Sequence, residues 1–300
     1  MSKKSFLKHS KIKKLSEWLK DKRTDVLGGK YCHLLLIEQL DKKNDVIGEL
    51  AEYFNQAYEP FRQHIRELLG YSLNPLENNA DDDPARGYPE NLHPLTLQGY
   101  FGEVFAGIVA EHYELLGSDE WEVPVFLFHS HDVAFQQLEL ARQTGNEVKR
   151  VPGRTGDDCL AFVRDSDGKI IRIMVCEAKC LTDHNATPIK DAHEKISSSN
   201  IIPVDTIKVI EALQLNSDKE NTVKWINALR RVYFKKDEIK ERCDMVLYIC
   251  GRAPKKDETW ISTTTPHKSY KGGRKLMATE IQLIDVSDIV KDVHDRVKEL

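Results

Sequence analysis

Two short apolar stretches joined by a turn constrain the fold of this chain most. They span 159–163 and 170–176, and the turn between them contains Asp167-Gly168. This pair is typical of tight hairpin turns, which need residues that accept positive φ. Both alternating sets of side chains in the two stretches are apolar, so other layers should cover both faces of the hairpin. We therefore expect a sheet that is packed between helices.

The turn also predicts which charged residues meet at the far end of the hairpin. A two-residue turn at 167–168 would place Asp158 directly opposite Glu177, roughly 5 Å apart on one face. Alternation of side chains brings Lys179 to the same face. A four-residue loop preserves this parity, whereas an odd-length loop or a bulge would present Asp157 instead. The expected result is two carboxylates and a lysine at one strand end.

Such a group is suited to a hard cation. Carboxylates on neighbouring strand ends bind Mg²⁺ or Mn²⁺ through oxygen, and the ion can share an oxygen with a phosphate. A bound ion activates water and stabilises charge on phosphoryl oxygens, and Lys179 could orient that water. The alternative interpretation is a polar turn followed by an ordinary strand end that faces solvent.

The remaining chain predicts a mixed α/β protein. The other predicted strands are 31–38, 121–128, 244–250, 259–265 and 279–286, and the predicted helices are 45–69, 95–116, 133–144, 185–199, 203–213, 220–232 and 286–300. This order indicates a central mixed sheet flanked by helices. Four prolines among Asn, Asp and Gly at 74–94 indicate a boundary. We therefore predict an N-terminal α/β region, residues 1–93, and a second domain, residues 94–300.

The helix at 95–116 contains an acidic residue in an unusual context. Glu103 lies on a stripe of small residues that includes Gly99, Ala106 and Gly107. Small residues let a helix backbone approach another layer closely, so this glutamate could reach a site on that layer. The alternative is a solvated glutamate at an exposed edge.

Charge and composition limit the partners. The net charge of −4 does not indicate a nucleic-acid-binding protein, but basic residues cluster at 1–30, ten against three acidic, and at 252–275, seven against two. Such patches either bind phosphate backbones or form solvated surface. Apolar runs are too short to cross a bilayer, no secretion signal is visible, and the six cysteines form no CxxC pair. We expect reduced thiols and a cytoplasmic protein without membrane or zinc.

The spacing of the acidic residues resembles a known family. Gly156-Asp157-Asp158, followed after 18 residues by Glu177-Ala178-Lys179, is similar to the PD-(D/E)XK nuclease superfamily, which has a restriction-endonuclease-like fold. The resemblance implies that Asp158 and Glu177, with Glu103 from the preceding helix, bind the metal and that Lys179 joins them in catalysis. The chain departs from the family where Gly156-Asp157 replaces the proline that often precedes the aspartate.

The family also tends to place a polar or basic residue on the helix after the E-x-K strand. Lys190, His193 and Lys195 are candidates, although His193 lies between two isoleucines and is interpreted as a packing residue. The predicted nucleic-acid-binding residues are Arg154, Lys190, Lys195, Arg252, Lys255, Lys256, Lys271 and Arg274.

A second resemblance covers residues 95–200. The GYFGEVFAGIVAEHY helix followed by the GDD and CEAK motifs resembles the C-terminal domain of HamA subunits of Hachiman anti-phage defence systems, which pair a nuclease with a helicase. It implies a Mg²⁺-dependent deoxyribonuclease that acts on DNA as the effector of a defence complex, with a helicase as partner. No GxxxxGK[ST] motif is present, so ATP use would belong to that partner. The alternative is a catalytically silent or partner-gated nucleic-acid-binding subunit, with residues 1–93 as its docking region.

Overall fold

The structure is a computed structural model, and it describes residues 9–71, 83–118, 120–128, 131–145, 147–148, 156–198, 202–203, 205–215, 220–255 and 258–300. Within these residues one sheet organises the chain. Its strands are β1 (Leu19–Val26), β2 (Tyr31–Glu38), β3 (Cys159–Arg164), β4 (Ile170–Leu181), β5 (Glu241–Cys250) and β6 (Lys275–Gln282). They follow the order β1-β2-β6-β5-β4-β3. The four inner strands are parallel and both edge strands are antiparallel to their neighbours, which confirms the predicted mixed sheet.

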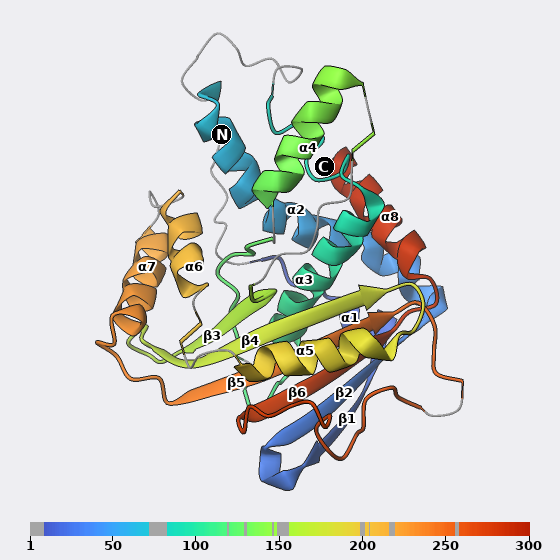
Figure 1. The fold of residues 1–300 in the computed structure, drawn as a ribbon, viewed down its shortest axis with the longest axis vertical. Coiled ribbons are helices and arrows are strands. Elements are labelled where there is room, and N and C mark those ends of the chain that lie inside the picture. Colours follow the sequence, from blue (N-terminus) through green and yellow to red (C-terminus); the bar gives the residue numbers. More distant parts are fainter. Residues whose placement is uncertain are drawn as a thin grey trace.

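Helices cover both faces of this sheet (Figure 1). They are α1 (Leu15–Trp18), α2 (Lys43–Leu68), α3 (Pro94–His112), α4 (His131–Thr144), α5 (Ala186–Ser198), α6 (Thr206–Gln214), α7 (Glu220–Tyr233) and α8 (Val286–Glu299), with short 3-10 turns η1 (Leu27–Gly29) and η2 (Leu40–Lys42). One core cluster joins α2, α3 and α8 to one face, and a second joins α5, α6 and α7 to the other. The parallel strands are buried on both sides, as their continuous apolar sequences require.

The N-terminal strands belong to the same sheet as the hairpin. β2 pairs with β6 from the end of the chain, and α2 packs against α8. Among the described residues, the predicted regions 1–93 and 94–300 therefore share one sheet and one core cluster. Part of the predicted boundary, residues 74–82, lies outside the described residues.

The hairpin has the predicted register but a different turn. Asp165 and Lys169 pair through an N–H···O bond of 2.9 Å, and Gly168 has φ +77°, so the loop has three residues rather than two. Ile171 then forms a bulge in β4 between two pairs of partners. The odd loop and the bulge cancel, and Cys159 lies opposite Cys176 as the predicted register requires. The two-residue turn was wrong, whereas the pairing that it was used to derive is confirmed.

Three further predictions differ from the structure. β1 was not predicted, because this edge strand is largely polar and exposed and lacks an apolar alternation. Residues 121–128 form no strand beyond one bridge between Glu122 and Phe162. Residues 259–265 also form none: the N–H groups of Trp260 and Ile261 donate to the buried carboxylate of Glu280 instead of a neighbouring strand. A side chain thus satisfies backbone donors that a sheet would otherwise satisfy.

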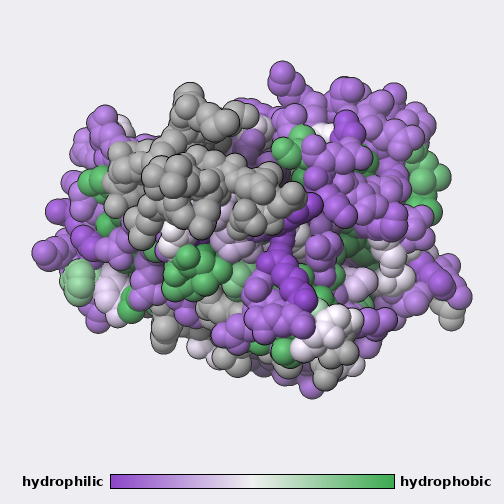
Figure 2. Space-filling view, turned by 90° about the horizontal axis from the view of Figure 1, so that it is seen from above, coloured by the Kyte–Doolittle hydropathy of each residue, from purple (hydrophilic) through white to green (hydrophobic). Residues whose placement is uncertain are grey.

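The surface and the thiols agree with a chain that folds around a sheet core. Figure 2 shows a largely hydrophilic surface on which hydrophobic residues form small patches. Among the helices described, none has both the length and the hydropathy needed to cross a bilayer. All six cysteines lie in the described residues, and all are free thiols.

A buried histidine should make stability depend on pH. The Nε2 atom of His294 lies 2.9 Å from the Tyr58 hydroxyl, and its Nδ1 atom lies 2.7 Å from the Val290 carbonyl oxygen. Burial lowers the pKa of His294 from 6.5 to about 4, so the unfolded chain binds a proton at higher pH than the folded protein does. The free energy of unfolding should therefore fall as the pH drops from 6.5 towards 4, by an amount on the order of 1–3 kcal/mol. Urea denaturation of wild type and His294→Gln across this range tests it; equal slopes would contradict the prediction.

Candidate active site

The first two predicted site residues meet where β3 begins and β4 approaches its end. Asp158 and Glu177 are buried, with residue exposures of 7 % and 2 %. The Asp158 N–H donates to the Cys176 carbonyl oxygen at 3.1 Å, which continues the hairpin by one residue. The Ala178 N–H donates to Asp158 Oδ2 at 2.7 Å and fixes the carboxylate beside Glu177. The backbone of the hairpin thus holds the Asp158 side chain in place.

Two lysines contact these carboxylates from different elements. Lys179 Nζ lies 2.5 Å from Glu177 Oε1. Lys195, on α5, contacts Glu177 Oε2 and lies 3.6 Å from Asp158 Oδ1. One ammonium therefore contacts both carboxylates, so Asp158 and Glu177 point to the same side of the sheet. The interpretation of an ordinary strand end that faces solvent is wrong.

The charges in this group influence one another strongly. Burial and the neighbouring charge of Asp158 raise the pKa of Glu177, while the ammonium groups of Lys179 and Lys195 act against this rise. Burial acts to lower the pKa of Lys195, but Asp158 and Glu177 outweigh it and the pKa is raised. Two buried carboxylates need a compensating positive charge, which the two lysines supply in this structure.

Asp157 has a separate environment. Its N–H donates to Asp205 Oδ2 at 2.8 Å, and Lys208 contacts the other oxygen of Asp205 at 2.5 Å. Burial and the nearby Asp205 raise the pKa of Asp157 to about 6. The hairpin register thus selects Asp158 over Asp157 as the residue that shares an ammonium with Glu177.

Glu103 lies on the helix that covers the other face of the sheet. It is buried, so the alternative of a solvated glutamate is wrong. The close approach of α3 to β4 is made by Gly102, where an added Cβ would lie 3.2 Å from Cys180 Cβ, rather than by Gly99, which has no such contact. Glu103 contributes to the raised pKa of Cys159, the residue after Asp158. It therefore lies near the start of β3.

A buried ionic group beside the site was not predicted. Asp244, at the start of β5, accepts hydrogen bonds from Arg242, Tyr270 and Arg274 at distances of 2.8 to 3.2 Å. Arg274 also donates to the Ile196 carbonyl oxygen at 2.9 Å, in the last turn of α5. Arg274, predicted to bind nucleic acid, thus links the end of α5 to β5. The sequence offers only a weak signal for this group: an Arg-x-Asp pair at the start of an apolar strand.

The other predicted nucleic-acid-binding residues are spread over several elements. Lys190 pairs with Glu194 on the surface of α5, and Arg252 pairs with Asp183. Lys255 and Lys271 are exposed, whereas Arg154 and Lys256 lie outside the described residues. The prediction that His193 is a packing residue is confirmed: it is fully buried, and its Nδ1 atom lies 2.7 Å from the Ile189 carbonyl oxygen.

The carboxylate pair fits one class of metal ion. Among the residues described, no group of three or more His, Cys, Asp and Glu side chains forms a metal site. Mg²⁺ does not require such a group, because it binds through one or two carboxylates and completes its shell with waters and phosphate oxygens. Asp158 and Glu177 match this mode: their oxygens already share a cationic group, the Lys195 ammonium.

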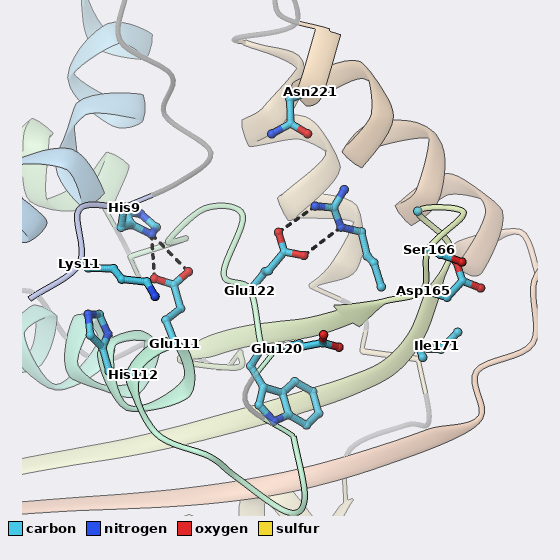
Figure 3. A pocket seen from close by; sticks show the side chains of 13 residues that line it. His9, Lys11, Glu111, His112, Glu120, Glu122, Asp165, Ser166, Ile171 and Asn221 are labelled. Atoms are coloured by element: carbon cyan, nitrogen blue, oxygen red, sulfur yellow. Dashed lines mark hydrogen bonds and ion pairs between the residues drawn. The ribbon is translucent and has the colours of Figure 1, made fainter.

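A cavity of about 910 Å³ lies elsewhere, beside the turn of the hairpin (Figure 3). It is lined by His9, Lys11, Glu111, His112, Glu120, Trp121, Glu122, Arg164, Asp165, Ser166, Gly168, Ile171 and Asn221. Several of its charged groups pair with one another, such as Glu122 with Arg164 at 2.8 Å and His9 with Glu111 at 3.3 Å. None of the predicted site residues lines this cavity.

The geometry can be set against known proteins. No protein-family model matches the chain, and a search of curated proteins finds no match either. The assignment of function therefore depends on the residues and their geometry.

Proposed function

We propose that this protein is a metal-dependent nuclease that hydrolyses DNA phosphodiester bonds. The observation that carries the proposal is the buried carboxylate pair, Asp158 and Glu177, which shares one ammonium and has Lys179 beside it. Buried like charges at one strand end are costly, and folds retain them mainly where a cation or a substrate uses them.

The arrangement of elements supports the resemblance to the PD-(D/E)XK superfamily. Asp158 opens β3, Glu177 and Lys179 lie near the end of β4, and α3 with Glu103 precedes the hairpin. The bridge between Glu122 and Phe162 adds a short pairing before β3, so that β3 is the second of three successive segments in the sheet. This agrees with a family in which the aspartate opens the second core strand.

Each residue then has a chemical role. Asp158 and Glu177 would hold Mg²⁺ or Mn²⁺, with Glu103 as a further acid near the start of β3. The ion, when bound, would activate water and stabilise charge on the phosphoryl oxygens. The ammonium of Lys179 lies next to Glu177 and is 30 % exposed, so it can contact an attacking water or a phosphate oxygen. Exposed Lys255, Lys271 and Arg252 would contact the DNA backbone, which gives little sequence specificity.

The test is a cleavage assay with the whole chain. Supercoiled plasmid, linear duplex and single-stranded DNA are incubated with Mg²⁺, with Mn²⁺ and with EDTA, and an RNA of the same sequence is included. Cleavage that needs the metal and is lost in EDTA supports the proposal. Its absence with all substrates, in a protein shown to be folded, would contradict an autonomous nuclease.

A partner-gated subunit is the second candidate. The Lys195 ammonium bound to both carboxylates favours it, because this contact occupies the oxygens that a metal would use. The HamA resemblance would make a helicase of an anti-phage defence complex the partner. Metal-dependent cleavage that appears only after this partner is added would select this candidate.

A further inference from the structure

Lys195 is placed as a cation between the two candidate metal ligands. Its ammonium contacts Glu177 Oε2 and lies 3.6 Å from Asp158 Oδ1, whereas Lys179 contacts the other oxygen of Glu177. A divalent ion shared by Asp158 and Glu177 would use the same oxygens. An ammonium and a metal ion cannot both occupy this position, because they would overlap and repel each other.

The backbone that carries Lys195 is firmly held. Its neighbours Ala192 and Ile196 are buried against the sheet, and the Ile196 carbonyl oxygen accepts a hydrogen bond from Arg274. Arg274 is in turn fixed by the fully buried Asp244. The α carbon of Lys195 is therefore anchored next to the carboxylates, so its ammonium returns readily to them whenever no other cation is present.

The side chain itself has room to leave. It is 34 % exposed, in contrast to the two carboxylates that it contacts. A lysine stem is long and flexible, so its ammonium can move into solvent without a change in the backbone. Exchange of the ammonium for a metal ion thus requires only a side-chain rotation.

We propose that Lys195 is an intramolecular competitor for the cation, so that a metal ion binds Asp158 and Glu177 only when the Lys195 ammonium withdraws. This inference rests on the proposed function, because it takes the carboxylate pair as the metal site. Lys195 then determines the metal affinity: the measured dissociation constant is the intrinsic one divided by the fraction of molecules in which the ammonium is already displaced. The residue keeps the buried acids paired while the site lacks metal.

The test measures Mn²⁺ binding directly, by isothermal titration calorimetry and by electron paramagnetic resonance of free Mn²⁺, with the whole chain. Lys195→Met should bind Mn²⁺ about tenfold more tightly than wild type, because the competitor is gone while the stem is retained. Lys195→Arg keeps the charge and should stay near wild type. Lys190→Met is the matched control: it removes the same charge from the same helix at an exposed residue paired with Glu194, and should change the affinity less than about twofold.

The outcomes separate this inference from the proposed function. Binding that Glu177→Gln abolishes, with equal affinity in wild type and Lys195→Met, overturns the competition but leaves the metal site standing. No Mn²⁺ binding in either protein overturns both proposals. Equal tightening by Lys190→Met and Lys195→Met would show a general charge effect and overturn the competition. Circular dichroism checks folding, and Lys195→Gln replaces Lys195→Met if that variant does not fold.

Discussion

Glu177→Gln is expected to reduce metal-dependent DNA cleavage by about 10²–10³-fold. The substitution keeps the shape of the side chain but removes the charge that would bind the metal, and Glu177 is the residue that both Lys179 and Lys195 contact. Single-turnover cleavage of a labelled duplex at saturating Mg²⁺ measures the chemical step without product release. Lys179→Met should show a loss of similar order with little change in metal affinity.

Two exposed residues of α5 serve as controls for this experiment. Glu194→Gln and Lys190→Met make the same chemical changes in an ion pair on the surface, and should retain cleavage within about twofold. Cleavage by Glu177→Gln at the wild-type rate would show that the activity belongs elsewhere. Equal losses in the control variants would show that charge on α5, rather than the carboxylate pair, governs the rate.

Asp244→Ala is expected to lower the free energy of unfolding by about 3–5 kcal/mol. The side chains of Asp244 and Arg242 are 0 % and 2 % exposed, and Arg274 and the Tyr270 hydroxyl also bond to Asp244. Removing the carboxylate leaves two guanidinium groups without their partner, one of them deeply buried. Urea denaturation at pH 7 with two spectroscopic probes measures the change.

A surface pair provides the comparison for this second experiment. Asp295→Ala removes the partner of Lys291 on α8, where both side chains are well exposed, and should cost less than about 0.5 kcal/mol. A similarly small cost for Asp244→Ala would contradict the structural role of the buried group. Because Arg274 also holds the end of α5, Asp244→Ala should shift the Lys195 position and alter Mn²⁺ affinity as well.

The hairpin shows how a local prediction can succeed through a wrong step. Asp167-Gly168 indicated a two-residue turn, but Asp165 Oδ1 accepts the N–H groups of Asp167 and Lys169 and stabilises a three-residue loop. The bulge in β4 restores the parity. Apolar residues on both faces leave one register that buries them all, so burial selects the pairing more strongly than turn chemistry does.

Features that depend on distant residues were beyond the sequence. Arg242 and Asp244 meet Arg274 because β5 and β6 are neighbours in the sheet, some thirty residues apart in the chain. Glu280 holds residues 260 and 261 by the same kind of long-range contact. Neither pattern has a local period, so the residues involved appeared as a basic patch and as a strand.

The sequence by itself determined the mixed sheet, the hairpin register and the residues Asp158, Glu177 and Lys179 at one strand end. These follow from alternation and apolar runs, which are local properties of the chain. Only the tertiary structure decided that Lys195 contacts both carboxylates and that Glu103 lies on a helix of the opposite face. The packing of α5 and α3 against the sheet sets these positions, and such packing depends on contacts between segments that are far apart in sequence.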